Sequence, residues 1–155
     1  MKNFLIILIF ILAIILQVSA APFLVVFNTG PNLILILILT LVVLKTFEKT
    51  WWIIVLTGFL IELFSGLPFG LISLSLIGSV YSIDWLNRNV FSTTNFWTMI
   101  SLIIFGSLIY SILIIILAIL FQIDLILNLQ HLFIELLYNL IMAIIFLYAA
   151  KKIFY

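Results

Sequence analysis

Long apolar runs separated by short polar breaks dominate the chain and predict membrane-spanning helices. Runs such as Phe4–Leu16 and Ile112–Phe121 are continuous and lack the period-two alternation of barrel strands. In hydrocarbon every backbone N–H and C=O needs a partner within the protein, so only helices or closed barrels cross it. The pattern predicts an all-α, polytopic integral membrane protein with one transmembrane domain. Six helices are expected, at about residues 4–20, 31–44, 50–64, 71–83, 96–121 and 131–150.

The polar breaks predict the connections between these helices. The most polar segment, Asp84–Asn95, is expected to be a loop, as is Gln122–Gln130. Two glycines and a proline in Ser65–Gly70 predict a compact turn. The run Pro31–Leu44 covers about 21 Å, less than the ~30 Å hydrocarbon core, so it is either a short helix in a thinned region or one that extends back toward Phe27.

Composition makes the bilayer the only adequate solvent for this chain. Its 155 residues are 68% hydrophobic and 7% charged, with a mean hydropathy of +1.55. Soluble domains are about 45–50% apolar and about 25% charged. A net charge of +1 offers no basic surface for nucleic acid, and the absence of cysteine excludes disulfides and thiolate chemistry. The sequence Val18-Ser19-Ala20-Ala21 also resembles a signal-peptidase site, but an uncleaved first helix is favoured.

The charged residues give an expected topology. Lys and Arg collect in short cytoplasmic loops, and Trp favours the membrane interface. With the N-terminus inside, six crossings put every basic residue on the cytoplasmic side and leave both chain ends there. These residues are Lys2, Lys45, Lys49, Arg88, Lys151 and Lys152, and the tryptophans at the same boundary are Trp51, Trp52, Trp85 and Trp97.

Ionisable groups inside a membrane are costly, so each is a candidate site. Glu62 near the outer end of the third helix and Glu135 near the outer end of the sixth share one level with Gln17 and His131. These side chains could form a polar cluster facing the bundle interior, or they could snorkel to nearby water. Snorkelling is favoured for His131, and both interpretations stay open for Glu62.

Asn139 shares a helix face with Glu135 and Tyr138, close to the bilayer midplane. A structural hydrogen bond between helices is the favoured role for its amide, and a substrate contact is the alternative. Asp84 and Arg88, four residues apart, predict a surface ion pair. Small-residue stripes predict close helix packing within the bundle: Ser75, Ser79 and Ser82 on the fourth helix, and Ser107 and Ser111 on the fifth.

The sequence contains no catalytic set. One histidine and scattered carboxylates pair no nucleophile with a base, show no metal-ligand spacing and accompany no phosphate-binding glycine loop. We therefore expect no enzymatic activity, no cofactor and no metal site.

Three stretches resemble the rod shape-determining protein MreD family. They are Leu16–Pro22 with Gly30–Leu33, the motif Gly58–Leu71, and Leu137-Tyr138-Asn139. The middle stretch is similar to the family pattern of Gly, apolar residues, an acid and then Ser-Gly-x-Pro-x-Gly. It gives the motif residues Gly58, Glu62, Ser65, Gly66, Pro68 and Gly70. The family usually has Asp at the position of Glu62 and often an acid at that of Asn32.

The resemblance implies a non-enzymatic scaffold of the cell-wall elongation complex in the bacterial plasma (inner) membrane. The implied partners are MreC, MreB, RodA and an elongation penicillin-binding transpeptidase. The implied fold is similar to that of the substrate-binding subunits of energy-coupling-factor vitamin transporters. Such a subunit, with its ligand near Glu62 and Glu135, is the alternative function, although the alanines of the first helix (Ala13, Ala20 and Ala21) lack the Ala-x-x-x-Ala spacing of its docking face. A small membrane protein of one lineage with no shared function is a third possibility.

Overall fold

The part of the chain with a described structure is α-helical. The structure is a computed structural model, and it describes residues 13, 15–17, 19, 25, 29–45, 47–91, 95–123 and 129–154. No strand occurs among these residues, so the all-α prediction is confirmed for them. Of the first expected helix, residues 13, 15–17 and 19 are described and are helical; the remainder of 4–20, including most of the signal-peptidase-like segment, lies outside the described residues.

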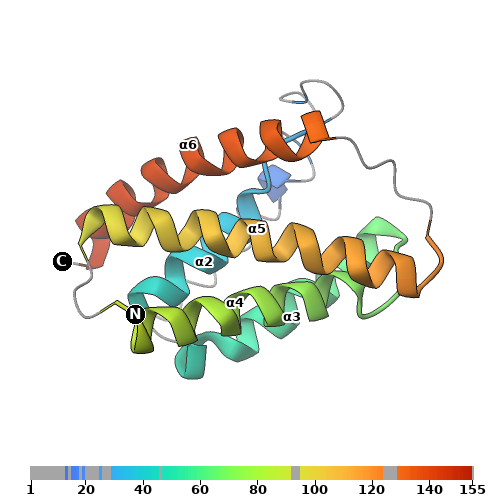
Figure 1. Cartoon of the computed structure of the whole chain (residues 1–155), viewed down its shortest axis with the longest axis horizontal. Helices are drawn as coiled ribbons and strands as arrows, with labels where there is room; N and C mark the ends of the chain where they lie inside the picture. The colour runs from blue at the N-terminus through green and yellow to red at the C-terminus, as the bar shows by residue number, and fades with distance from the viewer. Residues whose placement is uncertain are drawn as a thin grey trace.

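Five helices with described bounds pack as a bundle around one central member (Figure 1). Helix α2 contacts α3, α4, α5 and α6, while α3 packs on α4, α4 on α5 and α5 on α6. Consecutive helices from α3 onward run antiparallel (Figure 1). The helices are α2 (Leu33–Lys45), α3 (Phe47–Ser65), α4 (Leu71–Asn89), α5 (Phe96–Leu120) and α6 (Leu129–Phe154).

Helix α2 is the core of the bundle. Every residue from Leu33 to Val43 is buried. A helix that is apolar all round is a buried helix, because it has no polar face to give to solvent. The short second run is therefore enclosed by the other helices, and its 13 residues begin at Leu33.

The predicted loop Asp84–Asn95 is wrong for its first half, because α4 continues to Asn89. Two interactions hold this polar last turn in helical form. The Arg88 Nε lies 2.9 Å from the Asp84 Oδ2 one turn earlier, and the Asn89 side-chain amide donates to the Trp85 carbonyl at 2.9 Å. Helix α3 likewise begins earlier than expected, at Phe47.

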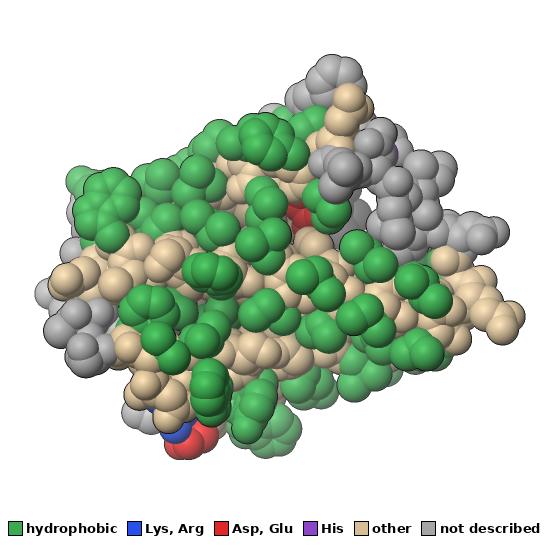
Figure 2. Space-filling model, in the orientation of Figure 1, with side chains coloured by type: hydrophobic (Ala, Val, Ile, Leu, Met, Phe, Trp, Pro, Cys, Tyr) green, Lys and Arg blue, Asp and Glu red, His purple; other side chains and the backbone are tan. Residues whose placement is uncertain are grey.

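The face of the bundle seen in Figure 2 carries mostly apolar side chains among those described. Exposed large side chains occur on every helix from α3 to α6, including Phe64, Trp97, Phe105 and Tyr148. By length and composition, two helices can cross a membrane, Phe96–Leu120 and Gln130–Ala149, whereas Leu33–Leu44 and Thr50–Ser65 are shorter apolar helices. This is weak evidence for a membrane protein, and the count of six transmembrane helices stays a prediction.

Candidate functional site

The Glu62 carboxylate caps the start of the neighbouring helix. Its Oε1 accepts hydrogen bonds from the backbone N–H groups of Ile72 and Ser73, both at 2.7 Å, and from the Ser73 hydroxyl at 3.1 Å. These are the second and third residues of α4, whose N–H groups have no partner within their own helix. Glu62 is 2% exposed, so it points into the bundle and does not snorkel to water.

The turn that joins α3 to α4 explains why a distant side chain must supply this cap. Gly66 and Gly70 have left-handed backbones, with φ of +68° and +101°, which glycine adopts without a steric cost. Gly70 occupies the N-cap position of α4, where Ser, Thr, Asp or Asn would normally accept these N–H bonds. Because Gly70 has no side chain, Glu62 takes that role from the preceding helix.

The remaining motif residues fix the same turn. The Pro68 carbonyl accepts the Leu71 N–H at 3.3 Å, and the Ser65 hydroxyl oxygen accepts the Leu67 N–H at 3.4 Å. A Cβ added at Gly58 would lie 2.7 Å from the Ser73 Cα, so α3 and α4 touch backbone to backbone there. Gly58 thus brings Ser73 within reach of Glu62.

Gln17 caps α2 in a similar manner. Its Oε1 accepts the Leu33 N–H at 2.8 Å, and its Nε2 donates to the Pro31 carbonyl at 3.1 Å. Asn32 supplies a local cap, since its Oδ1 accepts the Leu35 N–H at 3.2 Å. Gln17 is therefore a helix-capping residue that ties the first segment to the start of the central helix.

Tyr110 connects the predicted polar residues. Its side chain is buried, and its hydroxyl is close enough to the Asn32 side chain, Glu62 and Glu135 to be influenced by all three. The shared level of Gln17, Glu62, His131 and Glu135 stays a prediction, with Tyr110 near the two carboxylates. Sequence reasoning gave Asn32 no role and missed Tyr110, because a tyrosine within an apolar run carries no signal of its own.

Glu135 and Asn139 lie apart from the helix caps. The Glu135 Oε2 accepts a long hydrogen bond, 3.5 Å, from the Ser111 hydroxyl of α5. Asn139 is 1% exposed, and neither its amide nitrogen nor its amide oxygen has a hydrogen-bond partner. The predicted interhelical hydrogen bond of Asn139 is therefore not formed. His131 is half-buried in the first turns of α6.

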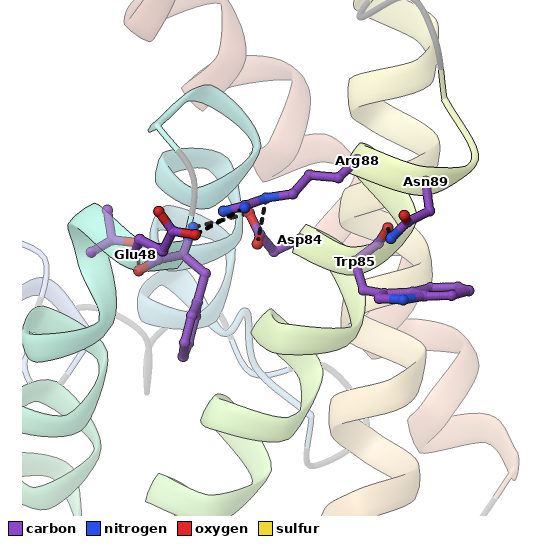
Figure 3. Close-up of polar contacts among 7 residues, drawn as sticks. Glu48, Asp84, Trp85, Arg88 and Asn89 are labelled. Atoms are coloured by element: carbon purple, nitrogen blue, oxygen red, sulfur yellow. Dashed lines mark hydrogen bonds and ion pairs between the residues drawn. The ribbon is translucent and has the colours of Figure 1, made fainter.

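Asp84 is a third side chain that caps a neighbouring helix, at the opposite end of the bundle. Its Oδ1 accepts the Phe47 N–H, the first residue of α3, at 3.0 Å. Arg88 bridges Asp84 and Glu48, 3.0 Å away, while Trp85 and Asn89 point to the other side of α4 (Figure 3). The Asp84–Arg88 ion pair expected from the sequence is thus present, with the Arg88 side chain 42% exposed and the Asp84 side chain 9% exposed.

The side-chain hydrogen bonds of Gln17, Glu62 and Asp84 have a structural role, because they cap helices. Among the residues that the structure describes, no group of three or more His, Asp or Glu side chains could hold a metal ion. The oxygens of Gln17, Glu62 and Asp84 are engaged by backbone N–H groups. Comparisons with protein-family models, with curated proteins and with solved structures gave no match.

Proposed function

We propose that this chain is a non-enzymatic scaffold of the bacterial cell-wall elongation complex and takes part in determining cell shape, as MreD proteins do. The observation that supports this is the turn between α3 and α4. The motif residues of Gly58–Gly70 act together on one feature, the exit of α4 from the turn. A chance likeness between apolar helices would not be expected to select residues with a common structural role.

In this proposal the chain crosses the plasma (inner) membrane six times, with both ends in the cytoplasm. The helix ends that carry Lys45, Arg88 and Lys151–Lys152 lie at one end of the bundle (Figure 1). The positive-inside rule assigns that end to the cytoplasm. The exposed indole rings at that end support the same orientation; they belong to Trp51, Trp52, Trp85 and Trp97.

The exposed apolar side chains of the bundle support the scaffold role, because such a surface can pack against other membrane helices. The partners proposed are MreC, MreB, RodA and the elongation penicillin-binding transpeptidase. A vitamin-binding subunit with its ligand near Glu62 and Glu135 is less well supported, because a ligand on Glu62 would take its oxygens from the N–H groups that it caps.

Crosslinked co-purification of a tagged copy from native membranes, read by mass spectrometry, tests the proposal. Recovery of MreC or the elongation transpeptidase is the expected result, together with widening or rounding of rod cells on depletion. Recovery of a paired ATPase and its membrane coupler without wall proteins would instead identify a transporter subunit. Unchanged cell width after full depletion would count against the scaffold role.

The turn itself can be tested with Gly70→Val. A β-branched residue at φ +101° is strained, so the start of α4 should shift and partner recovery should fall. Glu48→Ala is the matched control, because that side chain is 75% exposed and remote from the turn. Full recovery of partners with Gly70→Val would mean that turn geometry is not what the partners require.

A further inference from the structure

The line of contact between α5 and α6, called the seam below, is polar at one end and apolar at the other. The two helices are antiparallel and in contact, and Ser111 faces Glu135 across the seam. One turn back along α5 and one turn on along α6, the antiparallel register of this pair predicts that Ser107 faces Asn139. Continuing in the same steps pairs Ile103 with Ala143 and Met99 with Leu147, all of them buried. The seam is therefore apolar at one end and polar near the connection that joins the two helices.

The polar end of the seam is rich in oxygen atoms with free lone pairs. The Ser107 hydroxyl donates to the Ile104 carbonyl at 2.8 Å, and the Ser111 hydroxyl donates to the Ser107 carbonyl at 3.0 Å. The Ser107 oxygen therefore remains an acceptor. The Ser111 hydroxyl has one proton and two acceptors in reach, the Ser107 carbonyl at 3.0 Å and the Glu135 Oε2 at 3.5 Å, and its oxygen is free toward Glu135 when the proton lies on the nearer carbonyl. The Glu135 carboxylate and the Asn139 amide oxygen add further acceptors on the facing helix.

The unpaired amide of Asn139 indicates that a polar or charged partner is missing between α5 and α6. A buried polar side chain without a partner costs free energy, and native proteins satisfy nearly all such groups. Its amide is 1% exposed and unpaired, on the same helix face as Glu135 one turn away. Because Asn139 is covered on all sides, the missing partner is small.

When ionised, the Glu135 carboxylate also needs a positive charge beside it. In the described part of the chain, ion pairs occur between Arg88 and Glu48 and between Arg88 and Asp84, at the opposite end of the bundle. His131, one turn before Glu135, forms no ion pair with it. Figure 2 shows a small spot of acidic side-chain atoms between α6 and α5, with apolar side chains beside it. A carboxylate in such surroundings is stable only with its charge compensated.

We propose that Glu135, Asn139, Ser111 and Ser107 form a binding site for one small monovalent cation, of the sodium type. Oxygen ligands of this kind suit hard cations. A cation held at about 2.4 Å leaves neighbouring ligands roughly 3.4 Å apart, and the Ser111 and Glu135 oxygens are separated by 3.5 Å. One carboxylate balances one positive charge, whereas a divalent ion would leave a charge uncompensated in the bundle.

Thermal unfolding of the purified full-length protein in detergent tests the site. The melting temperature is measured in NaCl, LiCl, KCl and choline chloride at equal ionic strength and pH. A saturable rise in Tm with Na⁺ over choline is expected, because a ligand that binds only the folded state stabilises it. Equal melting temperatures in all four salts would overturn the proposal. So would a Tm that responds to pH alone, which would mean that a proton neutralises Glu135.

Variants separate a cation site from a structural role. Glu135→Gln should abolish the Na⁺-dependent shift, and Ser111→Ala should raise the Na⁺ concentration at half-effect roughly 10-fold or more. Asn139→Leu should lose the Na⁺ shift while melting at or above the unaltered protein in choline chloride, because the unpaired amide is gone. The control Glu48→Gln should keep the full shift. Variants that all respond to Na⁺ like the unaltered protein would place the ion elsewhere.

Discussion

Glu62 is the residue on which the α3–α4 turn depends most. We predict that Glu62→Ala destabilises the protein by about 1–3 kcal/mol for each buried donor left unpaired, since the N–H groups of Ile72 and Ser73 both lose their acceptor. Glu62→Gln should cost less, because an amide oxygen still accepts both bonds without the added strength of a charge. Thermal unfolding in detergent gives the order.

The matched control for this series is Glu48→Ala, which removes an exposed carboxylate and should change stability by less than about 0.5 kcal/mol. If Glu62→Ala were as stable as Glu48→Ala, the capping contact would contribute nothing to the fold.

Gly58 has a different role at the residue scale, since its hydrogen is what lets two backbones touch. Gly58→Ala should destabilise by about 1–3 kcal/mol, the usual cost of overpacking, although alanine is the better helix former. The new methyl group would lie 2.7 Å from the Ser73 Cα, a backbone atom that moves only with α4. Denaturant or thermal unfolding measures the loss.

Gly66→Asn is the companion variant for this prediction. Gly66 has open space around its Cα, and asparagine tolerates the left-handed backbone. Its stability should therefore stay close to that of the unaltered protein. A Gly58→Ala protein more stable than Gly66→Asn would show that α3 and α4 separate at little cost.

The residues of the turn were predictable, but their roles were not. Two glycines and a proline within six residues predict a turn, and an acid inside an apolar helix is a candidate site. Which donor Glu62 meets depends on how closely α3 and α4 approach, and Ser73 carries no sequence signal for that contact. The unpaired amide of Asn139 is likewise a property of the packed seam.

At the scale of elements, helix starts are held by side chains from other helices. We predict that Gln17→Leu loosens the start of α2, because the Leu33 N–H loses its acceptor and the Pro31 carbonyl loses its donor. Gln17→Glu keeps the acceptor and should have an intermediate effect. Hydrogen exchange should rise at the first turn of α2 in Gln17→Leu and remain unchanged in the middle of that helix.

Equal protection of the first turn of α2 in Gln17→Leu and in the unaltered protein would contradict this role.

Asp84 also caps another helix, but that helix, α3, precedes it in the sequence. Its segment was predicted to be a loop because it is polar, yet the polarity serves an ion pair within α4 and a cap on α3. Composition indicates where polar groups gather, and it does not say which of them hydrogen-bond to helices.

At the scale of the whole molecule, membrane topology can be measured directly because the chain contains no cysteine. Single cysteines introduced at exposed sites report the side they face to a maleimide that does not cross the membrane. Phe69→Cys and Gln122→Cys should react in intact cells, and Asn89→Cys and Asn95→Cys only after permeabilisation. All four residues are exposed, so access to reagent is comparable.

Labelling of Phe69→Cys and Asn95→Cys from the same side would rule out a crossing by α4.

The number of apolar runs was enough to predict a helical bundle, but the order in which its helices pack was not predictable. Most helices are apolar on all faces, and a sequence without an amphipathic stripe does not say which neighbours pack together. The central position of the short α2 is a result of that packing.

A capping residue can come before or after its helix in the sequence, and this order matters while the chain is being synthesised. Gln17 and Glu62 precede the helices they cap, so each acceptor has already been synthesised when α2 and α4 begin. Asp84 lies 37 residues after Phe47, the first residue of the helix that it caps, so the start of α3 has no such acceptor until α4 is nearly complete. We therefore expect α3 and α4 to enter the bilayer as a pair during synthesis. Until α4 is in place, water accepts the hydrogen bond of the first N–H group of α3.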